Sequence, residues 1–303
     1  MNRAVGGLLI AALAAVLIAG CGSTMDRAER VTLASLNLPA ATPAPASVTP
    51  PGRTCGTVTA SLRPPAVMPA PGHMPAGSFM AQIVRRGYLI AGVGQNTLLF
   101  GYFNPVDRRL EGFEIDLLKR LADAIFGRKP GDIRFKVITT DQRIAAVQSG
   151  SVDVVADAMT ITCARRRQVD FSTVYYDAGQ KLLVPSGSSV RGVQDLAGKP
   201  VCVTVGTTTL YTLEHARPRP QPYEVAERSD CLVALQAGLA DAVTSDDSIL
   251  LGFEAQDPYT KIVGARLADE PYGMAIRRSH PDFVRFVNGV LARMRADGSW
   301  RSI

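Results

Sequence analysis

Residues 112–125 read Gly-Phe-Glu-Ile-Asp-Leu-Leu-Lys-Arg-Leu-Ala-Asp-Ala-Ile, and this stretch has the pattern of an amphipathic helix. From Phe113 onward its apolar side chains recur four, four and three residues apart, which places them on one helical face. Short apolar runs at 89–93 and 133–138 flank the stretch and are typical of strands. Alternation of strand and helix predicts an α/β protein with mostly parallel sheets.

Two later segments of the chain are similar to each other in sequence. Residues 146–155 read Ala-Val-Gln-Ser-Gly-Ser-Val-Asp-Val-Val, and residues 234–243 read Ala-Leu-Gln-Ala-Gly-Leu-Ala-Asp-Ala-Val. In each copy a helix is expected to end at a glycine, because glycine tolerates the left-handed cap, and a strand follows an Asp. The repeat predicts two lobes of similar build, with a ligand cleft between the carboxyl ends of their strands.

The N-terminal segment has the features of an export signal. Residues 1–20 carry one charge, Arg3, followed by an apolar run and small residues before Cys21. The sequence Leu-Ile-Ala-Gly-Cys at 17–21 resembles the bacterial lipobox, in which the cysteine thiol receives a diacylglyceryl group. The alternatives are an ordinary signal peptide with a chance cysteine and a membrane-spanning helix, for which the run is short. We expect a lipoprotein anchored to the outer face of the cell membrane through acyl chains such as palmitate.

Residues 21–78 are rich in proline. Proline removes backbone donors and fixes φ, so no packed helix or strand is expected there. The segment is interpreted as a semi-extended tether that holds the folded body away from the membrane.

Four cysteines remain once Cys21 is assigned to the lipid: Cys55, Cys163, Cys202 and Cys231. Export places them where disulfides persist, and four cysteines allow three connectivities. We pair Cys202 with Cys231 because both lie in the same later segment, which leaves Cys55 for Cys163. The alternative is free buried thiols. No spacing matches a zinc site, so no metal is expected.

Composition and charge exclude little by themselves. The 303 residues are 47% hydrophobic and include 33 Lys+Arg against 27 Asp+Glu, a net charge of +6. The basic residues are scattered, and no basic run is interleaved with aromatics, which argues against nucleic-acid binding. The neighbouring carboxylates Asp246 and Asp247 are the candidates for acid–base chemistry. No Ser-His-Asp or Cys-His arrangement stands out, so we expect no enzyme and no cofactor.

Several segments together resemble one family. Residues 112–125 fit its signature, and further segments similar to the family are 157–165, 169–172, 206–208, 240–247 and 272–276. From about Leu89 to the C-terminus the chain resembles the family 3 extracellular solute-binding proteins, the polar amino-acid receptors of ABC importers. It is most similar to the actinobacterial glutamine-, glutamate- and aspartate-binding lipoproteins.

This resemblance implies the type II periplasmic-binding-protein fold, with two α/β lobes, two hinge crossover strands, a ligand cleft between the lobes and a monomeric state. The implied segments are lobe 1 at 80–174 plus 273–303, lobe 2 at 180–267, and hinge strands at 175–179 and 268–272.

The resemblance also implies where the carboxylate of an amino acid would bind. Arg165 offers a planar fork that meets a carboxylate with two charge-assisted hydrogen bonds. Thr160 adds a hydroxyl and a backbone donor. Gly206, Thr207 and Thr208 lie before a predicted helix, whose N-terminal N–H groups favour an anion. The alternative is that Arg165 is a solvated arginine at a helix start.

The ammonium group of the ligand requires acceptors. The resemblance assigns this role to the carbonyl of Ala158 and to the carboxylate of Asp246, which follows a predicted strand. Asp247 is interpreted as a cap of the next helix, although the sequence does not separate the two carboxylates securely. Arg165 and Asp246 are expected on opposite lobes, so a ligand that bridges them would favour the closed form.

The side-chain pocket is assigned by correspondence to Asn96, Thr140 and Lys181. A lysine there would favour a ligand with a side-chain carboxylate, hence aspartate or glutamate, with asparagine and glutamine tolerated as isosteres. The alternative is that Lys181 points to solvent. Glutamine-selective relatives enclose the ligand between aromatics, whereas the corresponding positions here are Leu99 and Thr140.

These observations predict a lipid-anchored, extracytoplasmic binding protein for polar amino acids that delivers its ligand to an ABC permease. The alternative is an amino-acid sensor whose closed form signals to a membrane protein.

Overall fold

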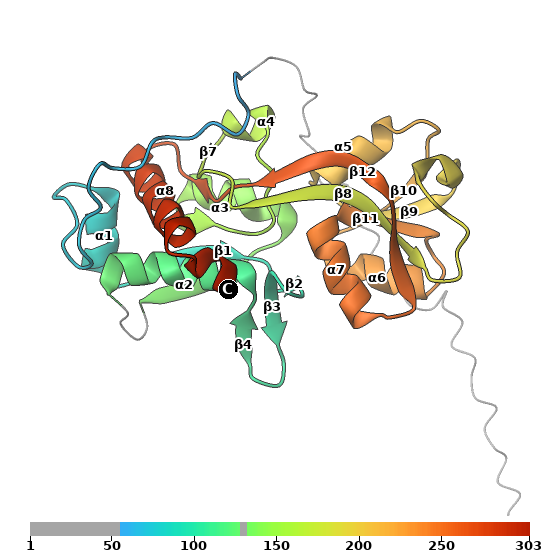
Figure 1. Cartoon of the computed structure of the whole chain (residues 1–303), viewed down its shortest axis with the longest axis horizontal. Helices are drawn as coiled ribbons and strands as arrows, with labels where there is room; N and C mark the ends of the chain where they lie inside the picture. Colours follow the sequence, from blue (N-terminus) through green and yellow to red (C-terminus); the bar gives the residue numbers. More distant parts are fainter. Residues whose placement is uncertain (1–54, 128–131) are drawn as a thin grey trace, which may run out of the picture. The chain divides into compact units, whose positions relative to one another are not determined.

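The computed structural model describes residues 55–127 and 132–303. Within these residues the chain forms two five-stranded sheets, each with helices packed against it, and a small three-stranded sheet. Figure 1 shows the two sheets in separate lobes that strands β8 and β12 connect. The predicted α/β class and two-lobed architecture are confirmed.

The sheet of lobe 1 has the strand order β5-β1-β6-β13-β7. Strand β1 pairs in parallel with β5 and β6, whereas β13 is antiparallel to both β6 and β7. The strands are β1 (Leu89–Val93), β5 (Ile133–Val137), β6 (Val154–Val155), β7 (Asp170–Phe171) and β13 (Ala275–Ile276).

Helices cover both faces of this sheet. The strand residues alternate between two hydrophobic clusters, because successive side chains point to opposite faces. Leu89 and Val93 pack in the cluster that contains α1, α2 and α8, whereas Ile90 packs in the cluster that contains α3. The helices are α1 (Phe79–Arg86), α2 (Phe113–Phe126), α3 (Arg143–Ser149), α4 (Cys163–Arg166) and α8 (Pro281–Ala296).

The sheet of lobe 2 has the order β10-β9-β11-β8-β12. Strands β9, β10 and β11 are parallel, and β8 joins them antiparallel to β11. Helix α5 covers one face, and α6 and α7 cover the other. The elements are β9 (Pro200–Thr204), α5 (Thr208–His215), β10 (Gln221–Val225), α6 (Arg228–Gln236), β11 (Ala242–Asp246) and α7 (Asp247–Gln256).

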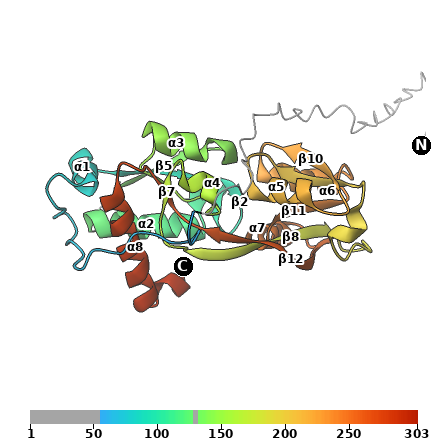
Figure 2. The ribbon, with the colours of Figure 1, turned by 90° about the horizontal axis from the view of Figure 1, so that it is seen from above.

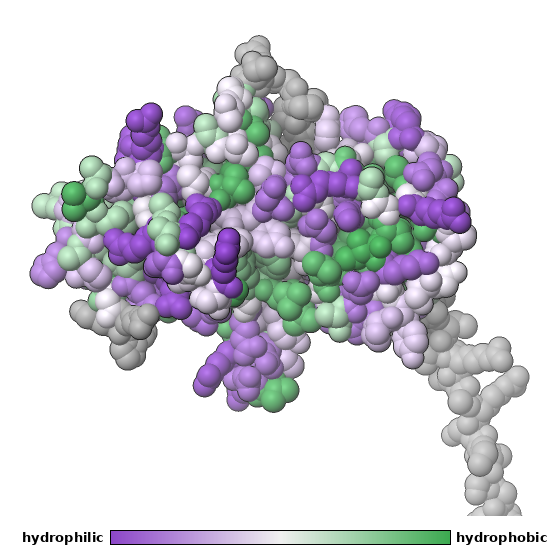
Figure 3. Space-filling model, in the orientation of Figure 1, coloured by the Kyte–Doolittle hydropathy of each residue, from purple (hydrophilic) through white to green (hydrophobic). Residues whose placement is uncertain are grey.

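Two long strands pass between the lobes, β8 (Tyr176–Pro185) and β12 (Thr260–Tyr272). They pair antiparallel from Tyr176 opposite Tyr272 onward, with a register irregularity between Val263 and Ala268. The two strands lie side by side in both ribbon views (Figures 1 and 2). Figure 3 shows polar side chains over most of one face of the molecule and a hydrophobic patch over β8, β12 and α7.

The remaining elements are short. The small sheet is antiparallel and has the order β2-β3-β4. Its strands are β2 (Asn96–Thr97), β3 (Gly101–Asn104) and β4 (Arg109–Glu111), and the 3₁₀ turns are Thr140–Gln142, Val193–Leu196 and Ser299–Ser302.

Both expected disulfides are present. Cys202 in β9 is bonded to Cys231 in α6, with 5.3 Å between their Cα atoms, so the bridge fixes a helix onto its own sheet. Cys55 is bonded to Cys163, with 5.6 Å between Cα atoms. The second bridge links Cys55, inside the proline-rich segment, to the first residue of α4.

Residues 55–78 form no helix or strand, but they lie against lobe 1. The Arg166 guanidinium donates to the carbonyl of Val58 at 2.7 Å, and the Asn288 amide donates to the carbonyl of Leu62 at 2.7 Å. The Gly72 N–H donates to the carbonyl of Ile125 at 2.8 Å. From Cys55 onward the proline-rich segment is therefore part of the folded body rather than a free tether.

The predicted signal peptide, the predicted lipidation site Cys21 and the first part of the predicted tether lie outside the described residues. Among the helices that the structure describes, none has the length and hydropathy needed to cross a membrane.

Candidate ligand-binding site

Arg165 lies buried beside the residues that sequence analysis grouped with it. Its guanidinium donates to the carbonyl of Thr160 at 2.8 Å and, across the lobes, to the carbonyl of Gly206 at 3.3 Å. The position follows from local structure, because Thr162 caps α4 and accepts a hydrogen bond from the Arg165 N–H at 3.2 Å. Burial lowers the pKa of Arg165, and nearby Glu270 opposes that shift. The alternative of a solvated arginine is wrong.

The N-terminus of α5 completes this side of the site. Thr207 is the N-cap, and its hydroxyl accepts a hydrogen bond from the Leu210 N–H at 3.1 Å. Gly206 adopts φ 72°, a left-handed conformation that glycine tolerates. The hydroxyl oxygens of Thr208 and Thr160 are 3.3 Å apart, which brings the two lobes into contact. The structure therefore places Gly206 and Thr208, at the start of α5, beside Arg165 and Thr160.

Asp246 is the last residue of β11 and is buried. Its Oδ2 accepts a hydrogen bond from the Tyr272 hydroxyl at 2.5 Å, while Oδ1 has no hydrogen-bond partner among the described residues. Burial and the neighbouring carboxylate of Glu270 raise the pKa of Asp246 to about 7. A buried acceptor without a partner is unfavourable, so Oδ1 is suited to bind an ammonium group.

Asp247 has a different environment. Its Oδ1 accepts hydrogen bonds from the backbone N–H groups of Gly179 at 3.1 Å and Ser248 at 2.9 Å. This carboxylate therefore holds strand β8 to the start of α7. The structure separates the two neighbouring carboxylates that the sequence left open. The predicted capping role of Asp247 is wrong, because Asp246 is the N-cap residue of α7 and Asp247 is the first residue of the helix.

Ala158 is held in a strained conformation, with φ 43°. Its N–H donates to Glu114 Oε1 at 2.6 Å, and its carbonyl accepts from Arg143 Nη1 at 3.2 Å. Burial and the charge of Asp157 raise the pKa of Glu114 to about 7. Two buried side chains therefore hold the backbone on both sides of Ala158, whose carbonyl was expected to face the ligand ammonium.

Glu270, on β12, links both lobes to the connecting strands. Its Oε2 accepts hydrogen bonds from the hydroxyl of Thr208 at 2.7 Å and from the hydroxyl of Thr160. Burial raises the pKa of this carboxyl, and the two hydroxyls oppose the shift.

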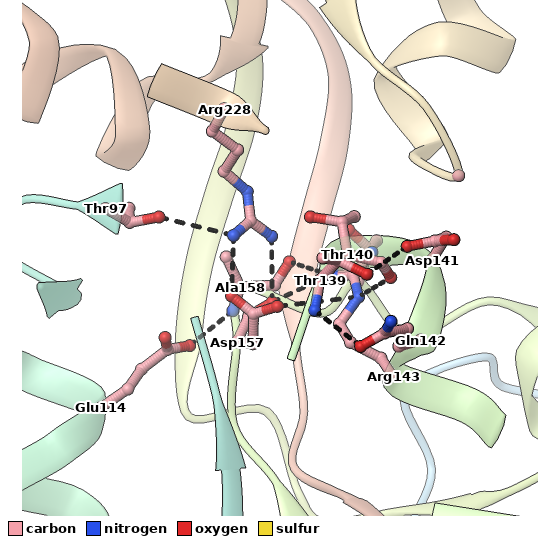
Figure 4. A network of polar contacts seen from close by, with 12 residues as sticks. Thr97, Glu114, Thr139, Thr140, Asp141, Gln142, Arg143, Asp157, Ala158 and Arg228 are labelled. Atoms are coloured by element: carbon pink, nitrogen blue, oxygen red, sulfur yellow. Dashed lines mark hydrogen bonds and ion pairs between the residues drawn. The ribbon is translucent and has the colours of Figure 1, made fainter. Parts of the chain in front are cut away.

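A second set of polar residues lies beside these residues (Figure 4). We call it the Asp157 cluster, and its members are Thr97, Thr140, Arg143, Asp157 and Arg228. Arg228, the first residue of α6 in lobe 2, donates through Nη1 to Asp157 Oδ1 at 2.7 Å and through Nη2 to the Asp157 carbonyl at 3.2 Å. Arg143 donates to the same carbonyl at 2.8 Å and to the carbonyl of Thr140 at 2.7 Å.

The Asp157 cluster contains a buried ion pair that crosses from one lobe to the other. Burial alone would lower the pKa of Arg228, but the charge of Asp157 raises it above its ordinary value. Burial and the charge of Arg165 lower the pKa of Arg143 to about 9. Gly94 leaves the space that the pair needs, since a Cβ there would lie 2.6 Å from Asp157 Oδ1.

Two residues expected in the side-chain pocket lie near this cluster. Thr140 is buried and belongs to it. Asn96 donates through its amide to Glu227 Oε2 at 3.0 Å, next to Arg228 in the other lobe.

Lys181 lies on a different surface of the sheet. In the pairing of β8 with β11, Asp246 is opposite Gln180, and Ser245 is opposite Lys181. The Gln180 amide donates to the Thr209 carbonyl of α5, so Gln180 and Asp246 share the α5 face. Because strand side chains alternate, Lys181 is on the face that α6 and α7 cover. The structure does not bring Lys181 to the other site residues.

Sequence reasoning missed Arg143, Arg228 and Glu270 as site residues. One signal was available: Arg143 and Arg228 are each the first residue of a helix, where the helix dipole disfavours a cation. A local preference that is broken in this way often marks a functional or paired residue. Nothing in the sequence pattern indicated that Arg228 and Asp157 would meet.

The fold and these buried residues define a class of protein. Residues 89–303 match the family described as bacterial extracellular solute-binding proteins, family 3. The chain belongs to this family.

Similar proteins are named for amino acids. The chain is 34% identical to the ABC transporter glutamine-binding protein GlnH of Bacillus subtilis over 74% of this chain and 82% of that protein. It is 28% identical to the glutamate/aspartate import solute-binding protein of Salmonella typhimurium over 74% and 77%. A solved structure of an ancestral arginine-binding protein bound to glutamine has a TM-score of 0.66 and 34% identity, covering 72% of this chain and 96% of that one.

Proposed function

We propose that this chain is an extracytoplasmic receptor for a polar amino acid, that a lipid on Cys21 anchors it to the cell membrane, and that it delivers its ligand to an ABC importer. The observation that carries the proposal is the pair of buried, opposite charges on the two lobes. Arg165 in lobe 1 is a cation beside a helix N-terminus, and Asp246 in lobe 2 has an acceptor oxygen that no group of the described residues hydrogen-bonds.

An α-amino acid matches these two charges because it is a zwitterion. Its carboxylate would accept hydrogen bonds from Arg165 and from the first N–H groups of α5. Its ammonium would donate to Asp246 Oδ1 and to the carbonyl of Ala158. Each end of the ligand contacts a different lobe, so binding would favour the arrangement in which the lobes meet.

Support for polar amino acids also comes from the relatives, whose names specify glutamine and glutamate or aspartate. Their names describe import and binding, which favours delivery to a permease over catalysis. A preference for acidic ligands rested on Lys181, and its position on the α6 and α7 face of the sheet gives that preference no support.

A thermal-shift screen of all twenty amino acids on the full chain tests the proposal, since a ligand that binds the folded state stabilises it by RT ln(1 + [L]/Kd). We expect one or a few polar amino acids to raise the melting temperature. A screen in which no amino acid changes the melting temperature would contradict the proposal.

A further inference from the structure

Three buried acceptor atoms near the proposed ligand contacts have no hydrogen-bond partner within the described residues. They are Asp246 Oδ1, Asp157 Oδ2 and Gln180 Oε1. All three side chains are at most 4% exposed. Buried polar groups are almost always hydrogen-bonded, so three acceptors of this kind in one region indicate that a donor belongs there.

These atoms cannot be satisfied by rotation of their side chains. In each residue the second polar atom is already bonded: Asp246 Oδ2 to Tyr272, Asp157 Oδ1 to Arg228, and the Gln180 amide nitrogen to the Thr209 carbonyl. The Gln180 orientation is fixed because a carbonyl can only accept. A rotation that paired one oxygen would break an existing bond.

The charges of the region also favour a ligand side chain that donates hydrogen bonds and carries no negative charge. Three buried guanidinium groups (Arg143, Arg165 and Arg228) face three buried carboxylates (Asp157, Asp246 and Glu270), and Glu114 adds a fourth. Asp157, which forms ion pairs with both Arg228 and Arg143, balances part of this positive charge before any ligand binds. A ligand side chain with a carboxylate would add a negative charge and further acceptors, which is costly in a buried site.

We propose that the ligand side chain carries a nitrogen donor, a carboxamide or a guanidinium, and that Asp157 Oδ2 accepts a hydrogen bond from it while Arg228 holds Asp157 in place. This inference rests on the proposed amino-acid-binding function. The ammonium of the ligand takes Asp246 Oδ1, and its side-chain nitrogen takes Asp157 Oδ2. Asp157 is a specificity-determining residue in this account, and Arg228 is its positioning residue.

Calorimetric titration of the full chain with glutamine, glutamate, asparagine, aspartate and arginine tests the inference. Each amide and its acid have nearly the same shape, so their affinity ratio reports the combined effect of the side-chain donor and of the carboxylate charge. We expect the better amide to bind about 100-fold tighter than its acid. If arginine binds tighter still, the donor is a guanidinium, and the inference holds.

A variant tests whether Asp157 causes the selectivity. In Asp157→Asn the amide oxygen is needed by Arg228, so the NH₂ group takes the place of Oδ2 and presents a donor. The amide-to-acid affinity ratio should fall at least about tenfold. The matched control is Asp269→Asn, which removes the same charge from an exposed side chain on β12. The control should leave the ratio unchanged.

Two outcomes would overturn the inference. One is glutamate or aspartate binding as tightly as its amide in the unmodified chain, a comparison that needs no variant. The other is an unchanged ratio in a folded Asp157→Asn protein, which would make the Asp157–Arg228 pair only a contact between lobes. If no amino acid binds at all, the proposed function itself fails, and that result is distinct from both.

Discussion

The residues around Arg165 and those around Asp157 contain similar charged groups, but the two sets differ in how these groups are paired. Arg165, Thr160 and Asp246 present a fixed cation and a fixed anion, which suit the two ends that every α-amino acid shares. The Asp157 cluster pairs its cation and anion with each other across the lobes, and among the described residues Asp157 Oδ2 accepts no hydrogen bond, although Arg143 Nε lies 3.9 Å from it. Both groups draw residues from the two lobes, but the arginines of the Asp157 cluster lie outside the short segments in which the sequence resembles the family.

The largest expected effect is a loss of stability when the Asp157 cluster is disrupted. Arg228→Met would leave Asp157 buried with Arg143 Nε, 3.9 Å from Oδ2, as its remaining ion-pair partner. We expect the free energy of unfolding to fall by about 3–5 kcal/mol. Denaturant unfolding measures this change, and the double variant Arg228→Met with Asp157→Leu should recover part of it. A single variant as stable as the parent chain would show that the ion pair carries no stability.

Arg165→Ala tests the first region by affinity. The variant removes the cation for the ligand carboxylate, and we expect a loss of about 2–5 kcal/mol in binding free energy. Isothermal calorimetry with the best amino acid from the screen measures the loss. The control is Arg167→Ala, two residues away and exposed, which should bind normally. Equal affinities of the two variants would remove Arg165 from the site.

Asp246→Asn should separate binding from stability. We expect the Asp246→Asn substitution to weaken ligand binding by about 1–3 kcal/mol, because the ligand ammonium loses its charged acceptor. The folded-state pKa of Asp246 is raised to about 7, so its contribution to stability is present at low pH and lost as the pH rises through about 7. The variant should therefore be more stable than the parent at pH 8, in the absence of ligand, by about 1 kcal/mol or more.

Asp247→Asn provides the comparison for that variant. Its side chain holds the backbone of Gly179 and Ser248, so we expect a smaller loss of ligand affinity. Calorimetry on both variants decides the assignment. A larger loss in Asp247→Asn would move the ammonium contact to Asp247.

The smallest expected effect is that of Lys181→Met. Since Lys181 is on the face of the sheet that α6 and α7 cover, its replacement should change the affinities for glutamine and glutamate by less than about 0.5 kcal/mol. Titration with both ligands measures the difference. A selective loss of glutamate binding would restore the role that sequence correspondence assigned to this lysine.

The sequence predicted the parts of the molecule that depend on local pattern. The helix at 112–125 and the strands that flank it follow from spacing, and the disulfide partner of Cys202 follows from its position in the same segment. The grouping of Arg165 with Gly206 follows from the family resemblance. Lys181 shows the limit of correspondence, because the face of a strand changes with every residue. The contact of Arg228 with Asp157 depends on how the lobes meet, which no local pattern encodes.

The central claim is that the two charged ends of an amino acid bridge Arg165 and Asp246. The most direct test is a competition titration with the best-binding amino acid, its N-acetyl derivative and its α-amide. We expect each derivative to bind at least about 100-fold more weakly than the amino acid. The N-acetyl derivative lacks the ammonium, and the α-amide lacks the carboxylate. Binding of either derivative within about tenfold of the parent amino acid would contradict it.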